Sequence, residues 1–311
     1  MPQNVFGCDL SKARIDIHDL ATGRDFFIAN EPAAIAAWLG EINADARVVF
    51  EATSGCDHAL MSALDGAGIV AHRVNPRQAR EFARATGRLA KSDRVDARVL
   101  ADMGARLDLP TFEPPEPVRQ LMAEIILRRE QLVGICKAEQ GRQAGFQDRE
   151  LARGARRLVR VVKAQILHLE IRLTETIRNN DALADAERRL RTIPGIGPLI
   201  AATLIARLPE LGRVDRRAIA SLAGVAPLAR DSGTSRGKRR IWGGRRDVRR
   251  ALFIAAVGAS RFAPTFKAVR DRMLAQGKAK KTVLIAIARR ILVTLNAMLR
   301  TGTDFQPNPQ Q

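Results

Sequence analysis

Tyrosine is absent from this chain of 311 residues, and phenylalanine and tryptophan together make up only 4% of it. A recombination mechanism that passes through a phosphotyrosine bond needs a tyrosine hydroxyl as its nucleophile. The missing residue type therefore excludes tyrosine recombinases and type I topoisomerases.

Cysteine and histidine are also scarce, with three cysteines and four histidines in the whole chain. No two of them are spaced as a C-x-x-C pair, since they are Cys8, Cys56 and Cys136. Neither a zinc site nor a disulfide framework is therefore supported. This usage is typical of a reducing compartment, and we expect a cytoplasmic protein.

Long uninterrupted apolar runs are missing as well. Asp9 and Lys12 come before any stretch that could act as a signal peptide, and Arg289 and Arg290 interrupt the most apolar stretch, 282–299. We therefore expect no contact with a membrane.

The net charge of +19 is distributed unevenly along the chain. Residues 1–110 contain 13 Lys and Arg against 15 Asp and Glu, whereas residues 111–311 contain 39 against 18. A general preference for arginine would make both parts basic. The excess in the second part favours nucleic acid as its partner over a membrane surface or an acidic protein.

The first 75 residues alternate between strand and helix patterns. The predicted strands are 4–10, 15–20, 25–29, 47–52 and 69–74, and the predicted helices are 32–42 and 57–66. A hairpin followed by a β-α-β unit predicts a mixed α/β sheet. The pattern is helical from Pro76 onward, and Ser92 is the expected N-cap of a helix that ends near Leu107.

Four prolines, Pro110, Pro114, Pro115 and Pro117, predict the end of this domain at residue 110. Apolar residues at helical spacing then predict a helical connector over 111–190, and two antiparallel helices or a dimerising coiled coil fit equally well. Residues 191–300 are expected to form a helical domain, and 301–311 a disordered tail.

Four carboxylates are placed where a metal site could form. Asp9 and Glu51 end predicted strands, and Asp93 and Asp96 lie three residues apart at the start of a helix, on one face of it. Carboxylate oxygens suit hard divalent cations such as Mg²⁺, and two such ions can activate the attacking oxygen and stabilise the leaving one in phosphoryl transfer. Each acid also has a purely structural explanation, as a turn, strand-end or helix-start residue.

The segment IPGIGP, 193–198, is the second candidate motif. Gly195 and Gly197 flank Ile196 at a turn between helices, where backbone N–H groups could hold a DNA phosphate. The same segment could instead be only a tight turn.

The third candidate is a basic stretch, 229–250, which predicts phosphate contacts and strongly salt-dependent binding. Its candidate contact residues are Arg230, Arg236, Lys238, Arg239, Arg240, Arg245 and Arg246. Ser232 or Ser235 could attack a phosphodiester if a base or metal activates its hydroxyl. From composition alone, a flexible basic loop is the more favoured interpretation.

These motifs resemble a known family. GCDLSK (7–12), VVFEATSG (48–55) and LAKSDRVDARVLADM (89–103) resemble the RuvC-like domain of the IS-one-ten insertion-sequence transposases and the related Piv-type pilin-gene invertases. IPGIGPLIAATLIA and GVAPLARDSGTSRGKRRIWGGRRDVRRALF resemble the family's C-terminal transposase domain. Ser92 stands where many relatives have threonine.

The resemblance implies an RNase H/RuvC-like N-terminal domain whose DEDD metal site corresponds to Asp9, Glu51, Asp93 and Asp96, with two Mg²⁺ ions that Mn²⁺ can replace. It implies that Ser232 is the nucleophile, and that the metal site of one subunit works beside the serine domain of another. The implied partners are double-stranded donor and target DNA, a structured guide RNA as in the bridge-RNA-guided recombinases, and further copies of the chain in a dimer or tetramer.

Three functions remain open on the sequence. The leading one is a transposase or site-specific recombinase of an insertion sequence that uses Mg²⁺ and Ser232. The second is a structure-specific endonuclease of the Holliday-junction type, which would use the four acids with water as nucleophile. The third is a nucleic-acid-binding protein with an inactive nuclease fold, although the presence of all four acids argues against it.

Overall fold

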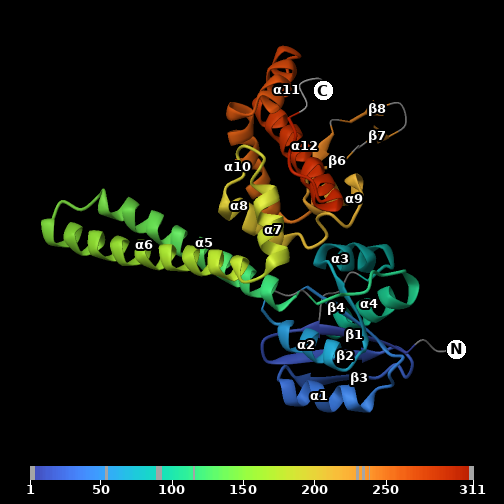
Figure 1. The fold of residues 1–311 in the computed structure, drawn as a ribbon. Helices are drawn as coiled ribbons and strands as arrows, with labels where there is room; N and C mark the ends of the chain where they lie inside the picture. The colour runs from blue at the N-terminus through green and yellow to red at the C-terminus, as the bar shows by residue number, and fades with distance from the viewer. Residues whose placement is uncertain are drawn as a thin grey trace. The chain divides into compact units, whose positions relative to one another are not determined.

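The computed structural model describes residues 4–52, 55–88, 93–114, 116–228, 231–232, 235–237 and 239–307. The chain forms two compact units, Met1–Pro114 and Pro115–Gln311 (Figure 1). The first unit ends four residues beyond the predicted boundary at residue 110.

The first unit is built on a five-stranded sheet. Its strands are β1 (Val5–Leu10), β2 (Arg14–Asp19), β3 (Asp25–Ala29), β4 (Arg47–Glu51) and β5 (Val70–Val74). Their order is β3-β2-β1-β4-β5, with β1, β2 and β3 antiparallel and β4 and β5 parallel to β1. The predicted mixed sheet is confirmed, and every predicted strand ends within one residue of the observed one.

Helices cover both faces of this sheet. The core on one face joins β-strand residues such as Phe50 to side chains from α1 (Pro32–Glu41) and α2 (His58–Gly66). The core on the other face joins strand residues such as Val49 to side chains from α3 (Pro76–Ala85) and α4 (Asp93–Arg106). Because side chains alternate along a strand, the sequence assigns Cys8 and Phe50 to the first face, and Gly7 and Val49 to the second.

Helix α4 lies directly on the backbone of β1 at Gly7. A Cβ atom built on Gly7 would lie 2.0 Å from the carbonyl oxygen of Ala97 and 2.4 Å from the backbone nitrogen of Ala101. Both contacts are with backbone atoms, so a side chain at position 7 would have to push the helix away from the sheet. The close approach therefore depends on glycine.

We expect Gly7→Ala to destabilise the first unit by about 3 kcal/mol, the upper part of the range for overpacked cores. Gly40→Ala is the matched control, because nothing lies within 4 Å of a Cβ at that helical position. Urea unfolding followed by circular dichroism measures both variants. Equal loss of stability in the two would show that the contact with α4 does not require glycine.

The second unit opens with two long helices, α5 (Pro117–Gln143) and α6 (Arg149–Arg178), which lie side by side as an antiparallel hairpin (Figure 1). Met122 and Ile125 of α5, with Leu173 and Ile177 of α6, belong to the main buried cluster of this unit. The segment predicted as a helical connector, 111–190, thus contains two antiparallel helices, and the base of their hairpin is part of the C-terminal core.

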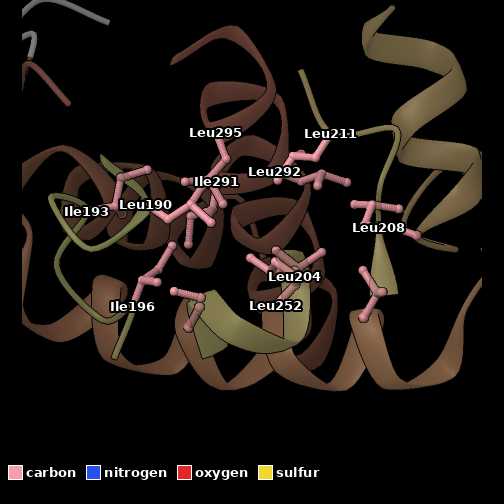
Figure 2. Packing of buried hydrophobic residues seen from close by; sticks show 14 of the residues in the cluster. Leu190, Ile193, Ile196, Leu204, Leu208, Leu211, Leu252, Ile291, Leu292 and Leu295 are labelled. Carbon is pink, nitrogen blue, oxygen red and sulfur yellow. The ribbon is translucent and has the colours of Figure 1, made fainter. Parts of the chain in front are cut away.

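The remaining helices surround that core. They are α7 (Asp181–Leu190), α8 (Pro198–Arg207), α9 (Arg216–Leu222), α10 (Arg246–Phe262), α11 (Pro264–Ala275) and α12 (Lys280–Thr301). Figure 2 shows Ile291, Leu292 and Leu295 of α12 packed among leucines and isoleucines from the other helices, including Leu204 and Leu252. The predicted helical domain is confirmed.

Helix α12 is the one helix of the described ranges that is long and apolar enough by itself to cross a membrane, and α10 with α11 would qualify only as one broken span. The apolar side of α12, which includes Val283, Ile287 and Leu292, is buried in the C-terminal core. Its hydrophobicity is thus accounted for by packing within the unit.

The chain beyond α12 is ordered as far as residue 307, which corrects the prediction of a disordered tail over 301–311. The Phe305 ring stacks on Phe266, with centroids 6.0 Å apart, and its backbone nitrogen donates to Thr192 Oγ1 over 3.0 Å. Asp304 forms an ion pair with Arg188 at 2.9 Å. These contacts hold the segment against α7 and α11; residues 308–311 lie outside the described part.

Candidate active site

Asp9 and Glu51 lie at the ends of neighbouring strands. Strands β1 and β4 are parallel, and Cys8 is opposite Phe50 in their register, so the next step along both strands brings Asp9 beside Glu51. Adjacent strands are about 4.8 Å apart. Asp9 lies two residues after Gly7, and Glu51 two residues after Val49, so both acids belong to the face that α4 covers. Both are half-buried.

Helix α4 brings its first turn to the same end of the sheet. Gly104 packs over Val5 and Val49, where a Cβ would lie 3.1 Å and 2.4 Å from their methyl carbons. Ala97 and Ala101 pack over Gly7, which is further along β1. The helix therefore runs opposite to β1, and its N-terminal turn lies toward the strand ends.

That turn carries the other two predicted acids. Asp93 is the first residue of α4, and Asp96 lies three residues later and is half-buried. The side chain of Asp93 is outside the described part of the chain. At the level of the backbone, the fold brings all four predicted carboxylate positions to one end of the sheet.

This donor set fits a hard divalent cation, because its oxygen ligands are carboxylates drawn from two strands and one helix. Among the side chains that the structure describes, no three His, Cys, Asp or Glu residues are grouped closely enough to hold a metal ion. The Asp93 side chain is not among those described. The residues that would hold the ion are Asp9, Glu51 and Asp96 together with Asp93.

Asp16 is a further acid beside these positions that was not among the predicted site residues. It lies on β2 directly opposite Asp9 and is only 7% exposed. Arg14 Nε donates to its Oδ2 over 2.9 Å. A signal was available, since Asp16 and His18 alternate with Ile15 and Ile17 in the predicted strand 15–20 and so mark a polar face beside Asp9.

A second group of polar residues ties α4 to the edge of the sheet. The Arg98 guanidinium donates to both carboxylate oxygens of Asp25, and His18 Nδ1 lies 2.7 Å from Asp25 Oδ1. The hydrogen bonds from Arg98 lower the pKa of Asp25 to about 2, with a smaller contribution from His18 and an opposing one from partial burial. The carboxylate therefore stays charged through the whole neutral and mildly acidic range.

Cys8 directly precedes Asp9 on β1, so its side chain lies on the opposite face of the sheet. Its side chain is fully buried in the core on the α1 side. Burial, and after it the negative charge of Asp9, raise the pKa of the Cys8 thiol far above its ordinary value. The thiol stays neutral, so Cys8 contributes packing to the site and no charge.

The glycines of the IPGIGP segment have different environments. Gly195 has φ +97°, and a Cβ there would lie 2.5 Å from the Ala259 nitrogen and 2.7 Å from the Ala255 oxygen. Gly195 thus permits the turn to pack against α10. Gly197 is the N-cap of α8, with nothing within 4 Å of a built Cβ, so phosphate contact there stays a prediction.

The basic stretch forms short strand pairs where we expected a loop. Strand β6 (Pro227–Leu228) pairs with β9 (Arg240–Ile241), and β7 (Asp231–Ser232) pairs with β8 (Ser235–Arg236). Ser232 is directly opposite Ser235 in the second pair. The side chains of 231–236 lie outside the described part, so the backbone alone makes these serines partners across a hairpin.

The candidate phosphate contacts of this stretch also differ from one another. Arg239, Arg240 and Arg246 are exposed. Arg245 instead forms an ion pair with Glu210, in which each of its two terminal nitrogens lies 2.6 Å from one carboxylate oxygen. It also donates to the Arg207 carbonyl oxygen. The structure therefore gives Arg245 a role in packing. Arg230, Lys238 and the side chain of Arg236 lie outside the described ranges.

Comparison with known families matches both units. A profile described as Transposase, for the DEDD domain of IS110 proteins, matches residues 8–145, and the profile of the Transposase IS116/IS110/IS902 family matches residues 187–270. Together they span well over half of the chain.

Individual relatives agree with these matches. The Pilin gene-inverting protein of Moraxella bovis is 29% identical over 237 residues, which cover 75% of this chain and 73% of that protein. An Insertion element IS110 protein of 43.6 kDa from Streptomyces coelicolor is 35% identical over 119 residues, or 38% of this chain and 29% of that one. An Insertion element IS900 protein of 42 kDa from Mycobacterium paratuberculosis is 29% identical over 162 residues, 48% and 40% of the two chains. With a mixed α/β unit that gathers the DEDD positions at one sheet end, and a helical unit that matches the second profile, this chain belongs to the IS116/IS110/IS902 family of transposases.

Proposed function

We propose that this chain is the recombinase of an insertion sequence, which cuts and rejoins double-stranded DNA with Mg²⁺ held by Asp9, Glu51, Asp93 and Asp96. The observation that carries the proposal is the convergence of β1, β4 and the first turn of α4 at one end of the sheet, in a chain of a transposase family. A divalent ion held there would neutralise phosphate charge and polarise the scissile bond.

In this proposal Ser232 supplies the nucleophile. Its Oγ forms a bond to phosphorus as the bond from phosphorus to one sugar oxygen breaks, and the hydroxyl proton passes to that leaving oxygen, directly or through a water molecule. The resulting phosphoserine keeps the energy of the broken phosphodiester for rejoining. The exposed arginines near Ser232 in the sequence support this role, because Arg239, Arg240 and Arg246 could bind the phosphates of a DNA backbone.

The expected partners include a second copy of the chain. The α5–α6 hairpin exposes apolar side chains along much of its length, with exposed fractions between 38% and 59% for Leu127, Ile135, Phe146, Leu151, Leu158, Val161, Leu167 and Ile171. Burial of some of these side chains against a second copy would remove apolar surface from water. We therefore expect a homo-oligomer, dimer or tetramer, joined along this hairpin.

The experiment that tests the function uses the purified full-length chain and DNA that joins the two sequences flanking its gene. We expect strand cleavage and joining with Mg²⁺ or Mn²⁺, loss of at least about 100-fold with EDTA, and return of activity when the ion is restored. Denaturing gels measure the products. Equal product with and without EDTA would rule out the proposed metal chemistry.

The same preparation tests for a guide RNA. We expect an RNA from the flanking sequence to co-purify, and digestion of that RNA with ribonuclease to abolish recombination. Full activity after digestion, with no enriched RNA, would favour an invertase that reads DNA by itself.

A further inference from the structure

The strand register continues the row of catalytic carboxylates toward the edge of the sheet. Glu51 of β4 is followed by Asp9 of β1, which is opposite Asp16 of β2, which is opposite Phe27 of β3. In each strand, the neighbours of these four residues point to the face that α1 covers. The four residues themselves therefore belong to the face that α4 covers. Phe27 is two strands from Asp9, a distance of about 10 Å at the usual strand spacing.

Phe27 does not serve the core. Its neighbours Phe26 and Ile28 pack into the cluster on the other face, whereas Phe27 is 65% exposed on the edge strand. The ring therefore leaves apolar surface available for contact with a ligand. Its position in the row of carboxylates suggests that its contact is with the substrate.

Arg14 accompanies the exposed ring. Its guanidinium lies 5.5 Å from the centre of the Phe27 ring, and its Nε donates to Asp16 in the same row. The Arg14 side chain is still 46% exposed, while Asp16 is largely covered. Asp16 thus holds a cation over an aromatic ring, in an orientation that leaves nearly half of the Arg14 side chain exposed.

This pair has the chemistry of a site for a single-stranded nucleotide. Unpaired bases stack on aromatic rings whatever their identity, and guanidinium groups bind the phosphates between them. The ~10 Å between Phe27 and Asp9 corresponds to about three base steps at the ~3.4 Å rise of stacked DNA. A base in a closed duplex already has stacking partners on both sides, so the occupant must be opened from its pair.

We propose that Phe27 and Arg14 form a nucleotide-docking patch, in which Phe27 stacks on an unpaired base of the cleaved strand within about three nucleotides of the scissile phosphate, and Arg14 contacts the adjacent phosphate. The patch rests on the proposed function, because it takes the carboxylates to mark the scissile phosphate. Asp16 is a positioning residue of the patch and acts through Arg14.

The test uses the full-length chain and the flanking DNA, with an abasic nucleotide placed at each of the three positions on either side of the cut. In the wild type, one abasic position should slow cleavage roughly 5- to 100-fold, the range for loss of one stacked base. Phe27→Ala should be slowed by a similar factor on intact DNA and should be insensitive to the abasic position. Phe27→Trp should restore both the rate and the sensitivity.

Phe262→Ala is the matched control, because Phe262 is also a strongly exposed phenylalanine, 76% exposed, and lies on α10 of the other unit. It should keep the wild-type sensitivity to the abasic nucleotide. If Phe27→Ala retains that sensitivity at any rate of cleavage, the ring does not stack on the base and the proposal is wrong.

A second measurement separates this proposal from the proposed function. A single-stranded 20-nucleotide oligothymidylate with one central 2-aminopurine reports stacking without any cutting. The wild type and Phe27→Trp should quench its fluorescence at saturation, and Phe27→Ala should quench it less. Equal quenching by all three would overturn the patch, whereas a wild type that quenches but never cuts the flanking DNA would count against the recombinase function alone.

Discussion

Asp9→Asn should lower DNA cleavage and joining by more than about 100-fold, because even groups that only support a metal ligand contribute 10- to 100-fold. The substitution keeps the shape of the side chain and removes the charge that attracts the ion. Asp9 also lies at the centre of the site, beside Glu51 on β4 and opposite Asp16 on β2. Product formation with Mg²⁺, together with calorimetric titration of Mn²⁺, measures the effect.

Asp65→Asn is the control for this experiment, since Asp65 is an exposed acid at the end of α2. It should keep wild-type activity and metal binding. DNA binding by Asp9→Asn should persist, because the basic surface is in the other unit. Wild-type biological activity in Asp9→Asn would instead support the third hypothesis, a nucleic-acid-binding protein that does not use the nuclease fold for chemistry.

Ser232→Ala should abolish the covalent adduct between protein and DNA and reduce joining on the order of 10³-fold or more, as expected when a nucleophile is removed. Gels run in detergent measure the adduct through its reduced mobility. Metal binding should be unchanged, since Ser232 belongs to β7 in the second unit.

Ser235→Ala is a closely matched control, because Ser235 is the direct partner of Ser232 in the β7–β8 pair. It should retain the adduct. The opposite result, with the adduct lost only in Ser235→Ala, would assign the nucleophile to the other serine. Continued cleavage by Ser232→Ala without any adduct would favour the endonuclease that uses water.

The first unit could be predicted closely from the sequence because its signals are local. Alternating residues in β1 and β2, the apolar run of β4 and the proline at the start of α1 each define an element within a few residues. Parallel strands end at the same edge of a sheet, so the proximity of Asp9 and Glu51 followed from topology alone. The position of α4 over Gly7 could not be derived in this way, because it depends on a contact between segments 90 residues apart.

Long-range contacts of charged and polar residues could not be predicted from the sequence. Arg245 belongs to a basic run by sequence, but Glu210 pairs with it from another segment. Asp304 and Phe305 lie in a stretch with the composition of a disordered tail, yet Arg188 and Phe266 bind them. Composition describes what a segment tends to do when isolated, and in these cases a partner elsewhere in the chain determines its structure.

The close contact of α4 with Gly7 has a consequence for genetics. The helix that carries Asp93 and Asp96 is separated from the strand that carries Asp9 by a space in which a methyl group does not fit. A random screen for inactive variants should therefore recover substitutions of Gly7 as often as substitutions of the acids themselves. Such variants would look like lesions of the active centre, although the altered residue has no side chain with which to take part in the reaction.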